Sequence, residues 1–239
     1  MVNRKTTARI TGAAYLALAI AGVVGFLVVR DQVFVAGDAA ATYTNYVEND
    51  GLVRLGLVAM FTVVVAQAVT AIGFWKLFTD VSPTSAFAIA VFGIVNSVII
   101  LVGTAFGAAA RYYAVGDGVA PGGDRAATVQ MLAELDGFAW EVGALFFGLW
   151  LIPMGFAVAK SGFFHAGTVL KWILVAGGVG YVLSAYVSYG FVDAPEALVE
   201  GLSVFSIVGE FWMILALLVV GVREDSTEAL ESQPGSAVR

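Results

Sequence analysis

Six apolar segments, each long enough to cross a lipid bilayer, account for most of this 239-residue chain. A spanning helix needs about 20 mainly apolar residues to cross a hydrocarbon layer of roughly 30 Å, and it must pair its backbone polar groups within itself. Charged residues make up only 13% of the chain, whereas they make up about 25% of a typical soluble domain. The sequence therefore predicts an all-α, polytopic membrane protein, a bundle of six transmembrane helices. The predicted spans are residues 10–29, 55–75, 86–110, 138–159, 170–190 and 203–222.

The chain is organised as one membrane domain, residues 1–222, followed by a short tail. The tail, residues 223–239, is acidic and poor in apolar residues, so we expect it to be disordered. The first apolar run follows a basic N-terminal segment, as in a signal peptide, but it extends to Val29 and is too long for the apolar part of a signal. We therefore interpret it as a retained span.

The positive charges favour one orientation in the membrane. With a cytoplasmic N-terminus, eight of the twelve Lys and Arg residues lie on the inner side. Because cytoplasmic segments of membrane proteins are rich in Lys and Arg, we expect a multi-pass protein of the cell membrane with both termini, and hence the tail, in the cytoplasm. The four outer ones are Arg30, Arg54, Arg111 and Arg125.

The outer loops are acidic in this orientation. An acidic face would attract cations, or it would simply be a solvated surface that keeps the loops out of the membrane. Both interpretations remain open from the sequence. The outer acidic residues are Asp31, Asp38, Glu48, Asp50, Asp117, Asp124, Glu134, Asp136, Asp193, Glu196 and Glu200.

Two glutamates, Glu141 and Glu210, interrupt the predicted spans. A charge inside a bilayer is costly, so each carboxyl should find a cation, face water or stay protonated. Arg111 is the nearest candidate partner by depth, and we expect it to pair with Glu141. Ser206 lies one turn before Glu210 and is placed to share a hydrogen bond with it. These four residues are the candidate intramembrane polar site, either lining an outward-open cavity or locking the helices together as structural groups.

Other residues within the spans have simpler interpretations. Gln67 and Asn96 fall at similar depth on the predicted second and third spans, and we expect an interhelical hydrogen bond between them. Gly103 and Gly107 form a GxxxG pattern, which is typical of helices that pack closely in lipid. The same role is expected of Gly177 and Gly180 in the fifth span.

The sequence lacks the usual signatures of cofactor and enzyme chemistry. It has one histidine and no cysteine, which argues against haem and metal sites, and we expect no cofactor and no metal. Ser161 and His165 share a loop, but they lack the orienting acid and oxyanion site of a hydrolase. An enzyme is therefore the less favoured class, and the expected partners are the lipid bilayer with a small solute, a cation or another membrane protein, and no nucleic acid.

Several short motifs occur in an order that resembles a known family. They are TARITGAAYLALAIAGV near the N-terminus, GLVRLGLVA before the second span, FFGLWLIPMGFAVAKSGFF in the fourth, GGVGYVL in the fifth, and GE followed by VVGV in the sixth. Together they resemble the bacterial six-span membrane family known as domain of unknown function 4386. The resemblance implies an integral membrane protein of unestablished activity, and it matches Glu210 to the Gly-Glu pair of the family.

Two functional hypotheses follow from these residues. The first is a small-solute or ion-coupled transporter that uses the intramembrane glutamates. The second is a non-catalytic accessory or interaction protein whose buried acids are structural. Water access to Glu210 would favour transport, whereas a dry, hydrogen-bonded carboxyl would favour the accessory role.

Overall fold

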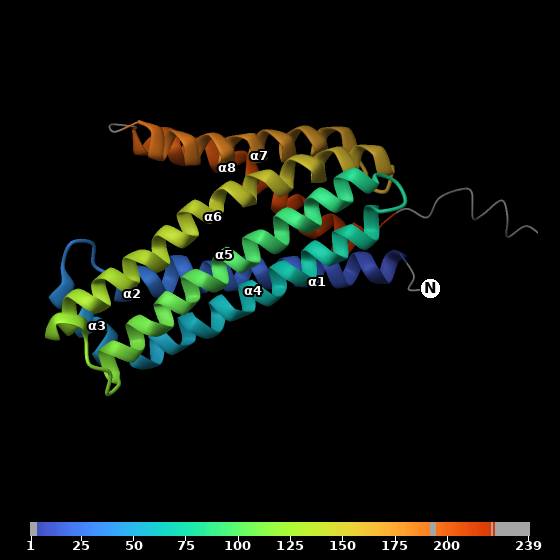
Figure 1. Ribbon diagram of the computed structural model, residues 1–239. Coiled ribbons are helices and arrows are strands. Elements are labelled where there is room, and N and C mark those ends of the chain that lie inside the picture. Colours follow the sequence, from blue (N-terminus) through green and yellow to red (C-terminus); the bar gives the residue numbers. More distant parts are fainter. Residues whose placement is uncertain (1–3, 192–194, 221, 223–239) are drawn as a thin grey trace, which may run out of the picture.

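The computed structural model describes residues 4–191, 195–220 and 222, and all regular structure in those ranges is helical (Figure 1). The predicted all-α polytopic bundle is confirmed. The α-helices are α1 (Arg4–Gly22), α2 (Arg30–Val33), α3 (Ala39–Glu48), α4 (Asp50–Phe78), α5 (Pro83–Val115), α6 (Arg125–Ser161), α7 (Gly167–Gly190) and α8 (Glu196–Leu215). The remaining helical segments are the π-helices η1 (Val23–Val29) and η3 (Ala216–Val220) and the 3₁₀ turn η2 (Pro121–Gly123).

Five helices in the described ranges are long and apolar enough to cross a membrane. They are Arg4–Val33, which joins α1, η1 and α2, together with α4, α5, α6 and α7. The sixth predicted span corresponds to a shorter apolar helix, Val204–Val219. The chain is thus a multi-pass helical protein, and the sixth crossing stays a prediction. The predicted disordered tail, residues 223–239, lies outside the described residues.

The boundaries of the fourth span differ from the prediction. The sequence suggested a long outer connection over residues 111–137, but α5 continues to Val115 and α6 begins at Arg125. The Asp124 side chain caps α6 by accepting from the backbone N–H of Ala127 at 2.9 Å. The 37 residues of α6 extend about 55 Å, well beyond a hydrocarbon layer of roughly 30 Å. Every residue in α6 therefore lies deeper along its helix than the sequence suggested.

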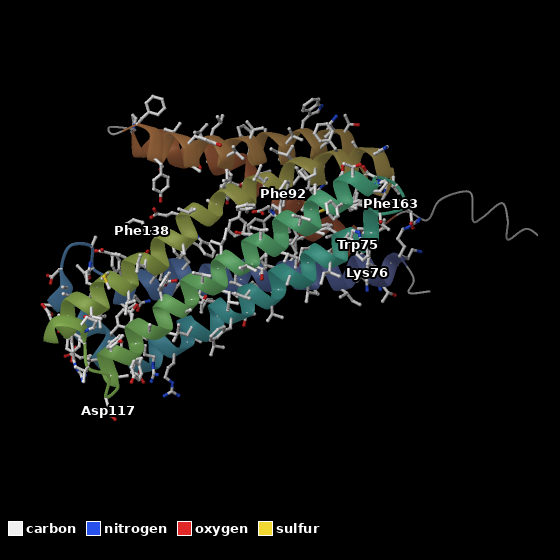
Figure 2. All side chains as sticks on the ribbon, in the orientation of Figure 1. Trp75, Lys76, Phe92, Asp117, Phe138 and Phe163 are labelled. Atoms are coloured by element: carbon white, nitrogen blue, oxygen red, sulfur yellow. The ribbon has the colours of Figure 1, made fainter. Side chains whose placement is uncertain are left out.

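The helix ends gather at two opposite ends of the bundle. The start of α1 and the α4–α5 and α6–α7 connections lie at one end, and α2, α3 and the α5–α6 connection lie at the other (Figure 1). Lys76 and Asp117 mark these two ends in Figure 2. The connections therefore alternate from end to end, as successive crossings of one membrane require. We call the end with α2 and α3 the outer end, following the predicted orientation.

A group of aromatic residues lies at the centre of the buried core. Trp150 of α6, Phe74 of α4 and Tyr15 of α1 are almost completely buried. The Tyr15 ring meets the Trp150 and Phe74 rings edge-on, at centroid distances of 5.4 and 5.9 Å. These contacts join three helices that are far apart in sequence, and they fix the position of Tyr15 inside the membrane region.

Glycines bring the backbones of α6, α7 and α8 into direct contact, and Gly180 is one of those predicted to do so. Gly148 and Gly178 face one another, and a methyl group added to Gly178 would lie 2.7 Å from the Gly148 carbonyl oxygen. A methyl group at Gly180 would collide with the carbonyl oxygen of Leu202. Because backbone atoms cannot move aside as side chains can, only glycine fits at these contacts.

We predict that Gly180→Ala destabilises the bundle by about 1–3 kcal/mol, because it overpacks the α7–α8 contact. The measurement is the thermal unfolding midpoint of the purified protein in detergent. Gly190→Ala on the same helix is the matched control, since nothing lies within 4 Å of a methyl group there. Equal midpoints for the two variants would show that α7 and α8 do not pack through Gly180.

Candidate functional site

Glu210 lies where α8 meets α1, in the membrane region of the bundle. Its Oε1 atom accepts a hydrogen bond from the Tyr15 hydroxyl at 2.8 Å. The two residues are 195 positions apart in sequence. Since lipid offers no hydrogen-bond donors, a protein partner of this kind is what allows a carboxyl group to remain in the membrane. The structure therefore turns Glu210 towards the bundle rather than towards lipid.

A second tyrosine lies near the same carboxyl group. Tyr181 of α7 is close enough to Glu210 to interact with its charge, and its hydroxyl forms a hydrogen bond with Ser206 of α8. Ser206 is completely buried. Glu210, Ser206, Tyr15 and Tyr181 thus form one polar group, contributed by three helices, which we call the Glu210 cluster.

The Glu210 cluster opens onto a groove of about 370 Å³. The groove runs between the first helix and α8, with α6 and α7 behind it. Its lining is apolar and aromatic apart from the cluster. The lining residues are Tyr15, Leu18, Ala19, Gly22, Val23, Phe26, Leu27, Trp140, Ala144, Phe147, Tyr181, Ile207, Glu210, Phe211 and Ile214. Pockets that bind small organic molecules commonly have this size and this mixture of rings with a few polar groups.

A π-helix forms part of one wall of this groove. Val23, Phe26 and Leu27 belong to η1, where the first helix widens to π-type hydrogen bonding. Such segments occur mainly as local interruptions of α-helices and are frequent at functional sites. The sequence does not indicate η1, because its residues are as apolar as those of a regular span.

Sequence reasoning identified Glu210 and Ser206 but missed Tyr15 as a partner. An isolated Tyr in an apolar run does not reveal which way it faces. Tyr15 does lie in the first of the motifs that resemble the family. Its place in that motif was the sequence feature that could have marked it as a site residue. Tyr181 was within another such motif, GGVGYVL.

Glu141 does not belong to the Glu210 cluster. It is exposed on α6, and its Oε2 atom accepts a hydrogen bond from the Tyr189 hydroxyl of α7 at 3.3 Å. It therefore lies on the α6–α7 side of the bundle, and it does not line the groove beside Glu210. Glu141 and Glu210 do not share a cavity.

The predicted pair between Arg111 and Glu141 is wrong. Arg111 instead binds Asp50 of α4 through both its Nε atom, at 2.6 Å, and its Nη2 atom, at 3.0 Å. Arg111 is four residues from the end of α5, whereas Glu141 lies sixteen residues into α6 and is level with the middle of α5. Gly143, two residues further on, faces Asn96. The error came from the predicted start of the fourth span, which placed Glu141 too close to the outer surface.

The predicted hydrogen bond between Gln67 and Asn96 is also absent. Both side chains are completely buried, and none of their amide atoms has a hydrogen-bond partner within the described part of the chain. Gln67 instead lies against Gly93, and Asn96 lies against Gly143. The two amides are at similar depth, as expected, but they face different neighbours around α5.

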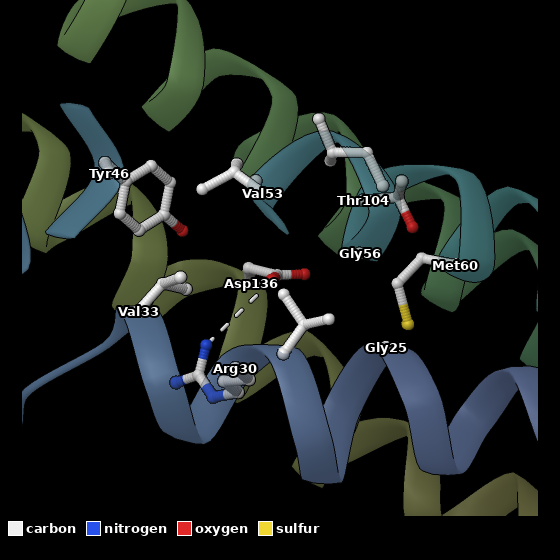
Figure 3. Close-up of a pocket in the computed structure, with 12 residues that line it drawn as sticks. Gly25, Arg30, Val33, Tyr46, Val53, Gly56, Met60, Thr104 and Asp136 are labelled. Atoms are coloured by element: carbon white, nitrogen blue, oxygen red, sulfur yellow. Dashed lines mark ion pairs between the residues drawn. The ribbon is translucent and has the colours of Figure 1, made fainter. Parts of the chain in front are cut away.

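A second polar site lies at the outer end, around Asp136 of α6 (Figure 3). The Arg30 Nη1 atom lies 3.9 Å from Asp136 Oδ2 and donates to the carbonyl oxygen of Ala133 at 2.9 Å. The space beside them is about 40 Å³, which is about the volume of one water molecule. This space is too small for an organic solute, so the site joins the first helix to α6 rather than binding a substrate.

Tyr46 of α3 completes this outer site. Burial and the nearby charge of Asp136 raise the pKa of Tyr46 to about 12, with Arg30 acting in the opposite direction. The Tyr46 hydroxyl therefore stays protonated in the physiological range. Gly107 of the GxxxG pattern leaves room for Asp136, since an added methyl group would lie 3.3 Å from its Oδ2 atom. From the sequence, Asp136 was predicted to lie in an outer loop, because the fourth span was predicted to begin after it.

The described residues contain no group of three His, Cys, Asp or Glu side chains that could hold a metal ion. The possible chemistry of the Glu210 cluster is therefore binding and proton exchange by one carboxyl and two phenol groups. Neither of these needs a nucleophile.

The helical bundle, with an acid inside its apolar region, defines a multi-pass membrane protein. A family model described as Domain of unknown function (DUF4386) matches residues 10–221, so the chain belongs to this family. No curated protein and no solved structure matches the chain.

We predict that Asp50→Asn and Arg111→Gln are coupled in their effects on stability, because each disrupts the same bidentate ion pair. A double-mutant cycle on unfolding in detergent should give a coupling free energy of about 1 kcal/mol, since the pair is bidentate but partly exposed. The cycle of Arg111→Gln with Glu141→Gln is the control and should be additive. Coupling in the control cycle would show that Arg111 interacts with Glu141, as the sequence predicted.

Proposed function

We propose that this protein is a small-solute or ion-coupled transporter of the cell membrane, with Glu210 as its central acid. The observation that carries the proposal is the position of Glu210, hydrogen-bonded to Tyr15 and lining a groove of about 370 Å³. An acid inside the membrane region marks substrate or proton pathways in many membrane proteins. Glu210 combines access to a groove with a partner that can stabilise it when the groove is empty.

The alternative is a non-catalytic accessory protein with a structural acid. The hydrogen bond from Tyr15 supports this alternative, because by itself it ties α8 to α1. The groove favours transport, since a purely structural acid needs no accessible space beside it. The outer acidic residues support neither function strongly, because several already have structural partners. Asp50 binds Arg111, Asp136 binds Arg30, and Asp38 and Asp124 cap helices.

Proton movement separates the two functions. Protein reconstituted in liposomes containing a pH-sensitive dye is given sugars, amino acids, carboxylates, amines and alkali cations in turn. We expect at least one class to change the internal pH faster than in protein-free liposomes. Glu210→Gln should abolish this response, because glutamine can accept the Tyr15 hydrogen bond but cannot exchange a proton. Glu141→Gln, outside this groove, is the control and should retain the response.

The opposite result would support the accessory role. In that case no solute class would move protons, while Tyr15→Phe and Glu210→Leu would lower only the stability. Removal of the Tyr15 hydroxyl should cost about 1–2 kcal/mol in either case, because it leaves a buried carboxyl without its donor. Stability alone therefore does not distinguish the two functions. The solute-dependent change of internal pH in the liposomes distinguishes them.

We further propose that both termini are cytoplasmic. The chain has no cysteine, so single-cysteine variants can be labelled selectively in spheroplasts with an impermeant thiol reagent. Glu48→Cys and Val119→Cys at the outer end should react, and Thr84→Cys and Thr168→Cys at the opposite end should react only after lysis. All four positions are exposed. Labelling in the reverse pattern would invert the orientation.

A further inference from the structure

A row of aromatic rings forms one wall of the groove beside Glu210. Phe26 stacks on Trp140 at a centroid distance of 4.5 Å, and Trp140 lies 5.6 Å from Phe147. Phe147 in turn lies 6.1 Å from Tyr181. The row therefore runs without a break from η1 across α6 to α7 and ends next to the Glu210 cluster.

The charge of the groove has one sign. Among the described residues that line it, Glu210 supplies the acidic group, and there is no Lys, Arg or His. The faces of aromatic rings also attract cations, because their π-electrons carry partial negative charge. The carboxyl and the rings therefore select the same kind of ligand, and an anion would meet repulsion from both.

The size and donor atoms of the groove do not fit a calcium or magnesium ion. Calcium and magnesium require about six or more oxygen ligands, whereas the polar lining consists of one carboxyl, two phenol groups and the indole of Trp140. No cluster of potential metal ligands occurs in the described ranges. A volume of about 370 Å³ instead suits an organic molecule with several apolar groups.

The groove is open on the surface of the bundle that faces lipid. Residues at its margins are about half exposed, including Leu27 at 58% on the first helix and Phe211 at 54% on α8. A ligand that partitions into the bilayer can therefore reach the groove sideways. A lipid acyl chain would also fit the apolar walls, but it would offer nothing to the carboxyl of Glu210.

From these observations we propose that the groove binds lipophilic monovalent cations, such as aromatic or alkylated ammonium and phosphonium ions. The cationic centre lies near Glu210, and the apolar groups lie against Phe26, Trp140 and Phe147. This inference rests on the proposed transport function and names its substrate class. It also predicts a binding site that can be measured without transport.

A pair of ions with the same shape and opposite charge tests the proposal. Tetraphenylphosphonium and tetraphenylborate have nearly the same size and apolar surface, so a purely apolar groove would not favour the cation. Equilibrium dialysis of the detergent-purified parent protein should show saturable binding of the phosphonium ion and at least about tenfold weaker binding of the borate. Equal binding, or preference for the borate, would overturn the proposal and indicate a groove for lipid chains.

Variants then assign the binding to this groove. Glu210→Gln should weaken phosphonium binding by at least about tenfold, and Trp140→Leu by about fivefold, because each removes one source of attraction. Glu141→Gln and Trp172→Leu are the matched controls outside the groove and should bind as the parent does. If Glu210→Gln does not fold, the comparison of the two ions on the parent protein still tests whether the groove prefers the cation. Unchanged binding in a folded Glu210→Gln variant would refute the assignment.

Transport of the same class distinguishes this proposal from the proposed function. Benzyltrimethylammonium, which crosses lipid slowly, is added to proteoliposomes, and its uptake is measured. Binding of tetraphenylphosphonium without any solute-dependent flux would retain the cation site and reject the transporter. Flux of another solute class without cation binding would retain the transporter and reject the cation site.

Discussion

Lipid provides no hydrogen-bond partners, and this constraint determines where the polar residues of the chain lie. Thr70 and Thr104 donate to carbonyl oxygens of their own helices, at 2.7 and 2.8 Å. Glu210 cannot do the same, because a carboxylate needs a donor and the backbone N–H groups within a helix are already used. Its donor must come from another helix, and Tyr15 supplies it. The meeting of α1 and α8 therefore depends on this carboxyl group.

Close contacts at glycines allow this meeting. Gly148 and Gly178 bring α6 against α7, and Gly180 brings α7 against α8. Without side chains at these positions the three backbones approach directly, and α8 is held where Glu210 reaches the first helix. The same contacts leave the groove on the other side of α8, where large aromatic residues line the walls. The small residues thus allow tight packing between α6, α7 and α8, and the aromatic residues line the open groove beside Glu210.

Much of the fold could be predicted from the sequence, because hydropathy reports whether a segment can cross a membrane. The helical class, the apolar segments and the packing role of the glycines all follow from local composition. The candidate site was predicted only in part. Glu210 and Ser206 lie in one cluster, but Arg111 binds Asp50, and Glu141 contacts Tyr189 outside that cluster. The position of the start of α6 caused that error, because an amphipathic segment outside the membrane continues the same helix.

The sequence by itself determined that the chain is a bundle of apolar helices with rare acids inside it, since each helix satisfies its own backbone and needs no partner to form. Only the tertiary structure decided which side chains meet. The partner of a residue depends on the depth and rotation of two helices relative to each other, and neither is encoded in the hydropathy of one segment. The hydropathy of the first span does not distinguish Tyr15 from its neighbours. The rotation of α1 turns the Tyr15 side chain towards α8, where it donates to Glu210.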